Sequence, residues 1–280
     1  MKIRIVQTAL AACLGVCGAS IAVAAPLLER AEAGQPIRLV FSNLKPGSYV
    51  GDNGQPTGRM NVIAMGVLKT MGYPRVEAVV MDYAGQIPAI QADRADIVTG
   101  GLYITKERCA NIAFSNPVAV SYEVLLVPKG NPKKLENYSD IASQGATLVT
   151  ITGYSSVVEN SKKGGVEKML MLPGTTQALA ALRAGRADAF ATSFTEAKTA
   201  VELTKEEFET AAHERMPADT KFYIAYGFRR NDVDFIAKFN KALSVYLGSP
   251  EMMKDLKNQG YDKATLPDGK SAAEACQLKQ

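Results

Sequence analysis

Apolar and polar residues alternate along this chain in two recurring patterns. Short runs of aliphatic and β-branched residues predict buried strands at residues 37–41, 76–80, 147–151 and 168–172. Between them, segments with helical character predict helices at residues 57–71, 135–142 and 154–161. Near the end of the chain, one apolar helix face is formed by Ile236, Phe239, Leu243 and Tyr246. Alternation of strands with helices is typical of α/β folds.

A repeated segment indicates that one strand–helix–strand unit is used twice. Residues 88–98 and 180–190 are identical at five of eleven positions, including the tripeptide Arg-Ala-Asp, at an offset of 92. Each copy is typical of a short helix, a turn and a buried strand, and each follows a predicted strand. Chance similarity in an alanine-rich sequence is the alternative, but the shared tripeptide in matching contexts favours a shared architectural role.

Two extended runs, residues 122–127 and 221–228, lie at the edges of the second unit. If both runs cross between the units, the second unit is an insertion into the first. The chain then forms an α/β fold with two lobes and a cleft between them. Lobe 1 would comprise residues 25–126 and 222–280, and lobe 2 residues 127–221. Two crossing strands would form the hinge.

The N-terminal segment, residues 1–24, is typical of a signal peptide. A short basic start precedes an uncharged stretch, residues 5–25, which contains the small-x-small motif AVA ending at Ala24. We expect cleavage after Ala24 and export to the periplasm. An uncleaved membrane anchor is disfavoured, because Gln, Thr, Ser and Gly residues dilute the hydrophobicity of the stretch. Lipidation at Cys13 ranks below simple cleavage, because it would leave a very short signal.

Export would leave two of the four cysteines, Cys109 and Cys276, in an oxidising compartment. Two leftover cysteines in such a compartment are more often paired than free, so we predict a disulfide between them. Two buried thiols that never meet are the alternative.

Composition excludes several classes of protein. Hydrophobic residues make up 47% of the 280 residues and charged residues 21%, with a net charge of +4. These values are ordinary for a globular chain, and the charge is too small to indicate a nucleic-acid-binding surface. With one histidine, His213, a histidine-rich metal site cannot form. The motifs G-x-S-x-G, H-E-x-x-H, the P-loop and G-x-G-x-x-G are absent, and we expect no metal, no cofactor and no catalysis.

Candidate ligand contacts follow strands, because open α/β sheets bind ligands beyond the carboxyl ends of their strands. In the first unit, residues 99–108 (TGGLYITKER) occupy this place. Gly101 allows close backbone approach, and Thr105 can cap a helix that begins at Lys106. Arg108 then lies one turn into the helix, where its guanidinium can bind a carboxylate through two parallel hydrogen bonds. The alternative for Arg108 is a solvated surface side chain.

Aromatic and hydroxyl side chains complete the candidate set. Tyr83, at a loop tip, could stack on a ligand or cover a cation, or simply pack the loop onto the sheet. In the second unit, the offset of 92 places Ser193 in correspondence with Gly101. Ser155 and Ser156 begin a helix whose free amides and hydroxyls suit an anion, with ordinary capping as the alternative. The predicted ligand contacts are Asn43, Tyr83, Gly101, Leu102, Tyr103, Arg108, Ser155, Ser156 and Ser193.

Residues 99–117 (TGGLYITKERCANIAFSNP) combine a Gly-rich loop, a Thr, an Arg and the motif Phe-Ser-x-Pro. In this arrangement the chain resembles the family-3 periplasmic solute-binding proteins of ABC importers. The resemblance extends over almost all of the mature chain. It implies a type II periplasmic binding protein fold, in which two lobes joined by a two-strand hinge hold a ligand in the cleft. It also implies an inner-membrane ABC permease as the partner of a monomeric binding protein.

The ectoine- and hydroxyectoine-binding subgroup is similar in having an Arg-Cys pair and a cysteine near the C-terminus. This similarity implies that Arg108 binds the ligand and that Tyr83 and Tyr103 are cage aromatics. The subgroup's acidic and aromatic cage positions fall on Leu44 and Gly47. In amino-acid binders of the family, an Asp takes the ligand's ammonium group, and that position is Ser193 here. The resemblance thus implies a retained carboxylate site and a changed cation site.

The sequence therefore predicts a periplasmic binding protein that delivers a small carboxylate-bearing solute, amino-acid-like or ectoine-like, to an ABC permease. A periplasmic enzyme on the same fold, such as a cyclohexadienyl-dehydratase-like lyase, is one alternative. It would need a general acid or base in the cleft, and none is found at the rim positions assigned above. A ligand-sensing module is the other alternative.

Overall fold

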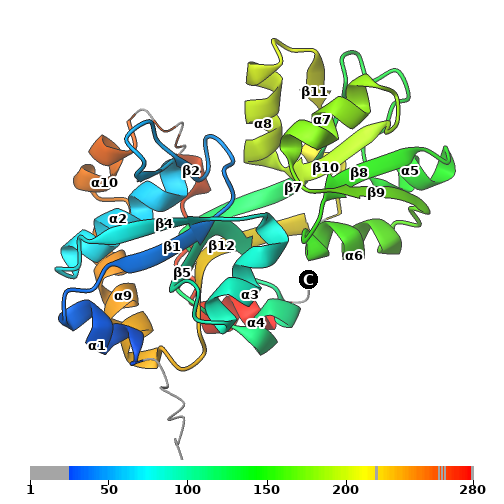
Figure 1. Ribbon diagram of the computed structural model, residues 1–280. Coiled ribbons are helices and arrows are strands. Elements are labelled where there is room, and N and C mark those ends of the chain that lie inside the picture. The colour runs from blue at the N-terminus through cyan, green and yellow to red at the C-terminus, as the bar shows by residue number, and fades with distance from the viewer. Residues whose placement is uncertain (1–24, 218–219, 258, 260, 262, 279–280) are drawn as a thin grey trace, which may run out of the picture.

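A computed structural model describes residues 25–217, 220–257, 259, 261 and 263–278. Two lobes lie side by side, and extended strands run between them (Figure 1). The predicted signal peptide, with its cleavage site after Ala24, lies outside the described residues. Within the described part of the chain, no helix is long and apolar enough to cross a bilayer.

Lobe 1 is built on a parallel sheet in the order β4-β1-β5. Its strands are β1 (Ile37–Phe41), β4 (Val76–Val80) and β5 (Ile97–Tyr103). One face is covered by α1 (Leu27–Glu32), α2 (Arg59–Thr70), α9 (Val233–Tyr246) and α10 (Pro250–Asp255). The other face carries α3 (Gln86–Gln91), α4 (Lys106–Asn111) and α11 (Ala272–Gln277). Small additional elements are β2 (Tyr49–Val50), β3 (Pro56–Thr57), β6 (Ala113–Phe114), and the 3-10 turns η1 (Tyr83–Gly85) and η4 (Lys263–Thr265).

Lobe 2 repeats the same strand arrangement, in the order β10-β8-β9. Its parallel strands are β8 (Thr147–Ile151), β9 (Lys168–Leu172) and β10 (Ala189–Ser193). One face packs on α5 (Tyr138–Ser143) and α6 (Ser155–Lys163), and the other on α7 (Thr175–Arg183) and α8 (Phe194–Leu203). The lobe also contains β11 (Phe208–Thr210) and the 3-10 turn η2 (His213–Arg215).

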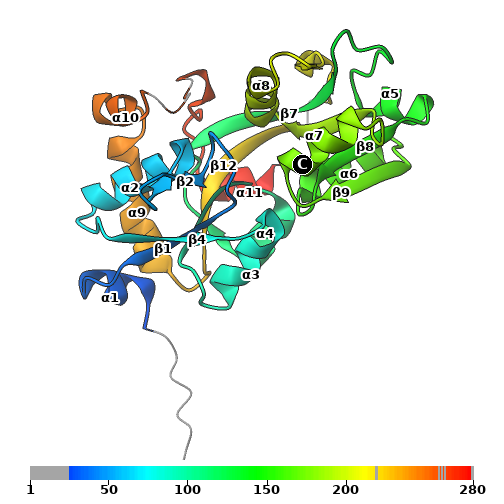
Figure 2. The same cartoon turned by 45° about the horizontal axis from the view of Figure 1, so that its top comes forward.

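Two long strands connect the lobes, as their predicted crossover role requires. β7 (Ala119–Pro128) pairs with β12 through its first residues and with β10 and β11 through its later ones. β12 (Lys221–Phe228) pairs with β7 at its start and then with β5 of lobe 1. Both views show this pair running between the lobes (Figure 2). The predicted boundaries at 126/127 and 221/222 fall within β7 and at the start of β12, and they remain predictions.

The sequence repeat corresponds to a structural repeat. Asp96 and Asp188 each precede the third strand of their unit, and each carboxylate accepts the backbone N–H of a residue in the central strand, at 2.9 Å in both lobes. In turn, the backbone N–H groups of Asp96 and Asp188 donate to the carbonyls of Arg38 and Thr147, respectively. The aspartate of the Arg-Ala-Asp tripeptide thus joins two strands of the sheet, which is the shared architectural role that the repeat predicted.

The predicted elements are confirmed with small shifts at their ends. The strands at 37–41, 76–80, 147–151 and 168–172 are present with the predicted bounds. In α9, the predicted apolar face is rotated slightly, because Phe235 is buried and Ile236 is only partly buried. The predicted N-cap of α4 is also present, since the Thr105 hydroxyl accepts the backbone N–H of Arg108 at 3.3 Å.

Candidate functional site

The main cavity of the described structure lies between the two lobes. Its volume is about 1260 Å³ including the space at its mouth, and residues of both lobes line it. Lobe 1 contributes the 44–48 loop, the start of α2, Tyr83 and the end of β5. Lobe 2 contributes Tyr154 and Ser156 beside β8, and the segment from Ser193 to Lys198. The cavity therefore occupies the carboxyl ends of strands in both units, where open α/β sheets bind ligands.

Arg108 lies at the junction of the two lobes. Its side chain is buried, and its Nη1 donates to the Tyr103 carbonyl at 3.0 Å. Its Nη2 donates to the carbonyl of Gly153, in lobe 2, also at 3.0 Å. These two bonds use part of the five-donor fork and leave further N–H groups for a carboxylate in the cavity. Arg108 is thus held in place and links the lobes.

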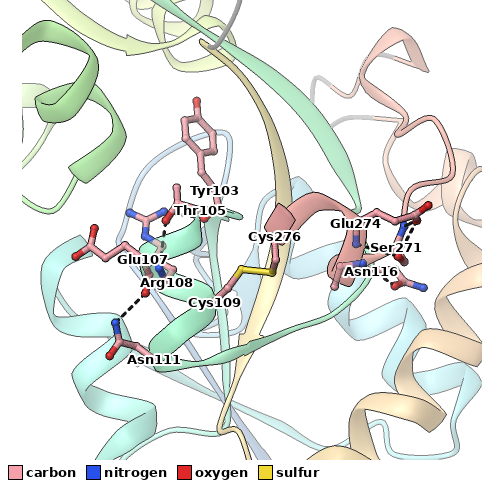
Figure 3. Close-up of a disulfide and its surroundings, with 11 residues drawn as sticks. Tyr103, Thr105, Glu107, Arg108, Cys109, Asn111, Asn116, Ser271, Glu274 and Cys276 are labelled. Atoms are coloured by element: carbon pink, nitrogen blue, oxygen red, sulfur yellow. Dashed lines mark hydrogen bonds between the residues drawn. A yellow bond between two sulfur atoms is a disulfide. The ribbon is translucent and has the colours of Figure 1, made fainter. Parts of the chain in front are cut away.

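A disulfide fixes the helix that carries Arg108. Cys109, the next residue on α4, is bonded to Cys276 on α11, which confirms the predicted pairing. Figure 3 shows the bond joining α4 to the C-terminal helix, with Arg108 and Tyr103 on the side away from α11. The start of α11 is itself anchored, since the Ala272 N–H donates to Asn116 at 3.2 Å. The C-terminal helix is therefore tied to the helix that presents Arg108.

Three tyrosine rings that line the cavity, those of Tyr83, Tyr103 and Tyr154, take part in two aromatic pairs. Tyr83 of lobe 1 contacts Tyr154 of lobe 2 edge to face, with ring centroids 4.8 Å apart, and the guanidinium of Arg108 lies over the Tyr83 ring at 5.7 Å. Tyr103 stacks on Phe222 at 4.6 Å. Burial raises the pKa of both Tyr83 and Tyr103, so their hydroxyls stay protonated. The Tyr83–Tyr154 contact and the Arg108–Gly153 bond show that the lobes touch across the cavity.

Glu196, in the first turn of α8, is the acidic residue among the described cavity-lining residues. Its carboxylate accepts hydrogen bonds from the hydroxyls of Tyr154, at 2.8 Å, and of Thr175 and Thr192. Burial raises the pKa of Tyr154 well above its usual value, so this hydroxyl remains a donor. Three donors hold the carboxylate in one orientation, where it can also accept from a cationic group in the cavity.

Arg59 enters the cavity from the start of α2. Its Nη1 is buried and has no hydrogen-bond partner among the described residues. The 44–48 loop fixes this helix end, because the N–H groups of Arg59 and Met60 donate to the carbonyls of Pro46 and Gly47 at 3.1 and 2.9 Å. Gly58, with φ of 90°, allows that contact, since a Cβ there would lie 2.6 Å from the Gly47 carbonyl oxygen.

Most of the predicted contacts line this cavity. They are Tyr83, Gly101, Tyr103, Arg108, Ser156 and Ser193. The positions matched to the subgroup's cage, Leu44 and Gly47, line it as well. Gly101 has φ of 80°, a conformation that favours glycine. The Ser193 hydroxyl accepts the N–H of Glu196 at 3.2 Å, so it also serves as the N-cap of α8.

Three predicted contacts lie elsewhere. The Leu102 side chain is buried in the core, packed near Gly227 of β12. Asn43 is exposed, and its side-chain oxygen accepts the N–H of Val50 at 3.1 Å. Ser155 lines a separate small crevice beside Thr105 and Glu159. These side chains do not border the main cavity.

Sequence reasoning did not identify Glu196, Arg59 or Tyr154. The predicted rim positions contain no acidic group, and Glu196, which lines the cavity, lies three residues beyond the rim position Ser193. The sequence feature that marks Glu196 is the spacing Ser193-x-x-Glu196, which is typical of a capping box at a helix N-terminus. The Glu196 side chain turns into the cavity, where hydroxyls from three segments converge on it. Those segments are separated in sequence, so only the tertiary structure brings them together.

The fold and the cavity define a two-lobed ligand-binding protein of the type II periplasmic class. The chain belongs to the bacterial extracellular solute-binding proteins, family 3, whose model matches residues 37–257. It is 32% identical to a probable amino-acid ABC transporter periplasmic-binding protein, y4tE, of Sinorhizobium fredii (strain NBRC 101917 / NGR234). That match covers 89% of this chain and 85% of the relative.

Two solved structures bear on the site. EhuB in complex with hydroxyectoine is 27% identical, with a TM-score of 0.79 and coverage of 90% of this chain and 98% of that one. An ancestral amino acid-binding protein, AncCDT-1, described as a precursor of cyclohexadienyl dehydratase, is 25% identical with a TM-score of 0.71. That match covers 82% of this chain and 96% of the ancestral protein. Binding proteins and the precursor of an enzyme thus share this architecture.

Proposed function

We propose that this protein is the periplasmic solute-binding component of an ABC importer, and that it captures a small zwitterionic solute, amino-acid-like or ectoine-like. The observation that carries this function is the placement of Arg108 and Glu196 in one cavity, on opposite lobes. Arg108 binds the solute's carboxylate, and Glu196 accepts from its cationic nitrogen. Tyr83 and Tyr154 form an aromatic wall beside them.

Glu196 supplies the contact for the solute's cationic group that Ser193, which has no carboxylate, cannot make. Family amino-acid binders place an acidic residue at the position of Ser193, and here the carboxylate comes from one helical turn further along α8. The description of y4tE as a probable amino-acid ABC transporter periplasmic-binding protein and the complex of EhuB with hydroxyectoine support a solute of this class. Both solute types combine a carboxylate with a positively charged nitrogen group.

A lyase on this fold is the second candidate, and Glu196 is the residue that could serve as its acid or base. The hydroxyls of Tyr154, Thr175 and Thr192 already donate to its carboxylate. A group held in this way is suited to act as a fixed acceptor for a ligand. We therefore infer binding without turnover.

The remaining features of the proposal follow from the family. We infer that the precursor is exported and cleaved after Ala24, and that the monomeric mature protein delivers its solute to an inner-membrane permease. No cofactor or nucleic acid takes part. The lobes, with boundaries near residues 127 and 221, close on the solute through rotation within β7 and β12. The solute favours the closed form through contacts that exist only there, such as those with both lobes at once.

A thermal-shift screen of the purified mature protein tests this function. The panel comprises amino acids, ectoines, betaines and small carboxylates without a cation. A solute at a hundredfold excess over its dissociation constant stabilises the folded protein by about 2.7 kcal/mol, which raises the melting temperature measurably. We expect zwitterions to do so and to be recovered chemically unchanged, as measured by mass spectrometry. Conversion of the bound solute into a product would favour the lyase.

A further inference from the structure

Building on the function proposed above, we propose that the solute carries a second acid group, which Arg59 binds at a site separate from Arg108. The expected class is a dicarboxylic amino acid or a close analogue, with two carboxylates and one cationic nitrogen. Arg59 and Arg108 would each take one carboxylate, and Glu196 the nitrogen.

The first argument is that one guanidinium nitrogen of Arg59, Nη1, is buried without a hydrogen-bond partner among the described residues. Arg59 lines the cavity. A buried charged donor without a partner is costly, because it has lost its hydration without replacing it. Burial indeed lowers the pKa of Arg59, although the nearby Glu196 carboxylate opposes this change. An anionic group in the cavity would satisfy this donor.

The second argument is that Arg59 has no ion-pair partner among the residues that the structure describes. Glu196 acts on Arg59 electrostatically, but no hydrogen bond joins the two side chains in the described structure. The Glu196 carboxylate instead accepts from the hydroxyls of Tyr154, Thr175 and Thr192. Arg108, in contrast, already has two carbonyl partners. Arg59 is therefore the cationic group in the cavity with the greatest need of a ligand acceptor.

The third argument is the position of Arg59 in its helix. It is the first residue of α2, where the helix dipole disfavours a positive charge. The loop contacts that bind the first amides of α2 to Pro46 and Gly47 hold this residue against the cavity. A cation kept at an unfavourable helix end, and aimed into a ligand cavity, is better explained by binding than by stability.

The charge balance of the cavity points the same way. Four cationic side chains line it, namely Lys45, Arg59, Arg108 and Lys198, against the single carboxylate of Glu196 among the described lining residues. Lys45 and Lys198 are exposed at the mouth. A positive cleft attracts anions and accelerates their entry. A solute with a net negative charge fits this balance better than a neutral zwitterion.

Isosteric acid and amide pairs test the proposal on the wild-type protein. The probes are L-glutamate against L-glutamine and L-aspartate against L-asparagine, together with the longer diacid L-2-aminoadipate, each titrated by calorimetry. We expect at least one diacid to bind about tenfold to a hundredfold more tightly than its amide, since a hydrogen-bonded charge is lost in the amide. Equal affinities within every pair would overturn the proposal.

Variants of Arg59 test whether this residue causes the preference for the acid over its amide. Arg59→Gln should abolish the preference for the acid, and Arg59→Met, of similar length, serves as a second variant if the first does not fold. Lys69→Gln is the matched control, because it removes one positive charge from the exposed far end of the same helix, outside the cavity, and should keep the preference. Loss of Arg59 should not lower the melting temperature of the ligand-free protein, whereas a purely structural arginine would.

The outcomes separate this proposal from the function on which it rests. If monocarboxylate zwitterions bind and the diacids do not, or if Arg59→Gln retains the acid preference, the second acid group is wrong and the binding function stands. If neither these probes nor any solute of the wider screen binds, the proposed binding function itself is contradicted.

Discussion

Replacing Asp96 with asparagine removes a charge that three arginines share in lobe 1. The carboxylate of Asp96 is fully buried and accepts from Arg38 at 2.9 and 3.0 Å, from Arg229 at 3.2 Å, and from Arg30. Burial alone would raise the pKa of Asp96, but the hydrogen bonds from Arg38 and Arg30 outweigh it and lower this pKa to about 2. Asparagine can still accept the backbone N–H of Arg38, so the variant isolates the loss of charge.

The size of the effect follows from that pKa. A depression from 3.8 to about 2 corresponds to roughly 2 kcal/mol of folding free energy at neutral pH. Removing one partner of a buried ion pair costs about 3–5 kcal/mol, because the remaining charges are left uncompensated. We therefore expect Asp96→Asn to lower the free energy of unfolding by about 3 kcal/mol, measured by urea denaturation at pH 7.

The second lobe supplies the matched control. Asp188 occupies the equivalent position, but its side chain is 23% exposed and its partner Lys133 is 52% exposed. An exposed pair contributes at most about 1 kcal/mol, so Asp188→Asn should cost much less than Asp96→Asn. The Asp96 contribution is present above pH 4 and is lost as the pH falls toward 2, so the difference between wild type and Asp96→Asn should shrink there. Equal losses for both variants at pH 7 would refute this reasoning.

Three further predictions concern the site and its support. Glu196→Gln should weaken the binding of a zwitterionic solute by about tenfold or more. The binding of a carboxylate without a cation should change little, and titration calorimetry measures both affinities. Tyr83→Ala removes the ring beside Tyr154 and Arg108, and it should weaken the binding of a cationic solute by about 0.5–2 kcal/mol. Unchanged affinity would exclude the aromatic wall. Cys276→Ser should lower the unfolding free energy by up to about 5 kcal/mol in the chain-entropy model, given the separation of 167 residues, and an unchanged urea midpoint would contradict a stabilising role.

The fold could be predicted because its signals are local. The Arg-Ala-Asp tripeptide marks the same strand junction in both lobes, and short apolar runs mark the parallel strands. Cys109 and Cys276 were predicted to pair from their number and compartment, without any knowledge of their positions. Arg108 was identified for a similar reason, since a predicted cap and a predicted strand end place it next to the cleft.

The charge set of the cavity could not be predicted in full. Glu196 and Arg59 each lie on a helix whose sequence is ordinary, and their role depends on which face of that helix meets the other lobe. Leu102 shows the same limit in a strand, because a shift of one residue turns a side chain from the cleft into the core. Asn43 was expected at the site because it follows a strand, but its side chain caps a neighbouring loop instead.

The most direct test of the account is calorimetric titration of the tightest solute from the screen into wild type, Arg108→Lys and Arg108→Ala. Arg108 is the carboxylate anchor and also joins the lobes through Gly153. Arg108→Ala should weaken binding by about 2–5 kcal/mol. Arg108→Lys should recover only part of this loss, because a point charge cannot reproduce the guanidinium fork. Wild-type affinity in Arg108→Ala would contradict the claim that this cavity captures the carboxylate of a small solute.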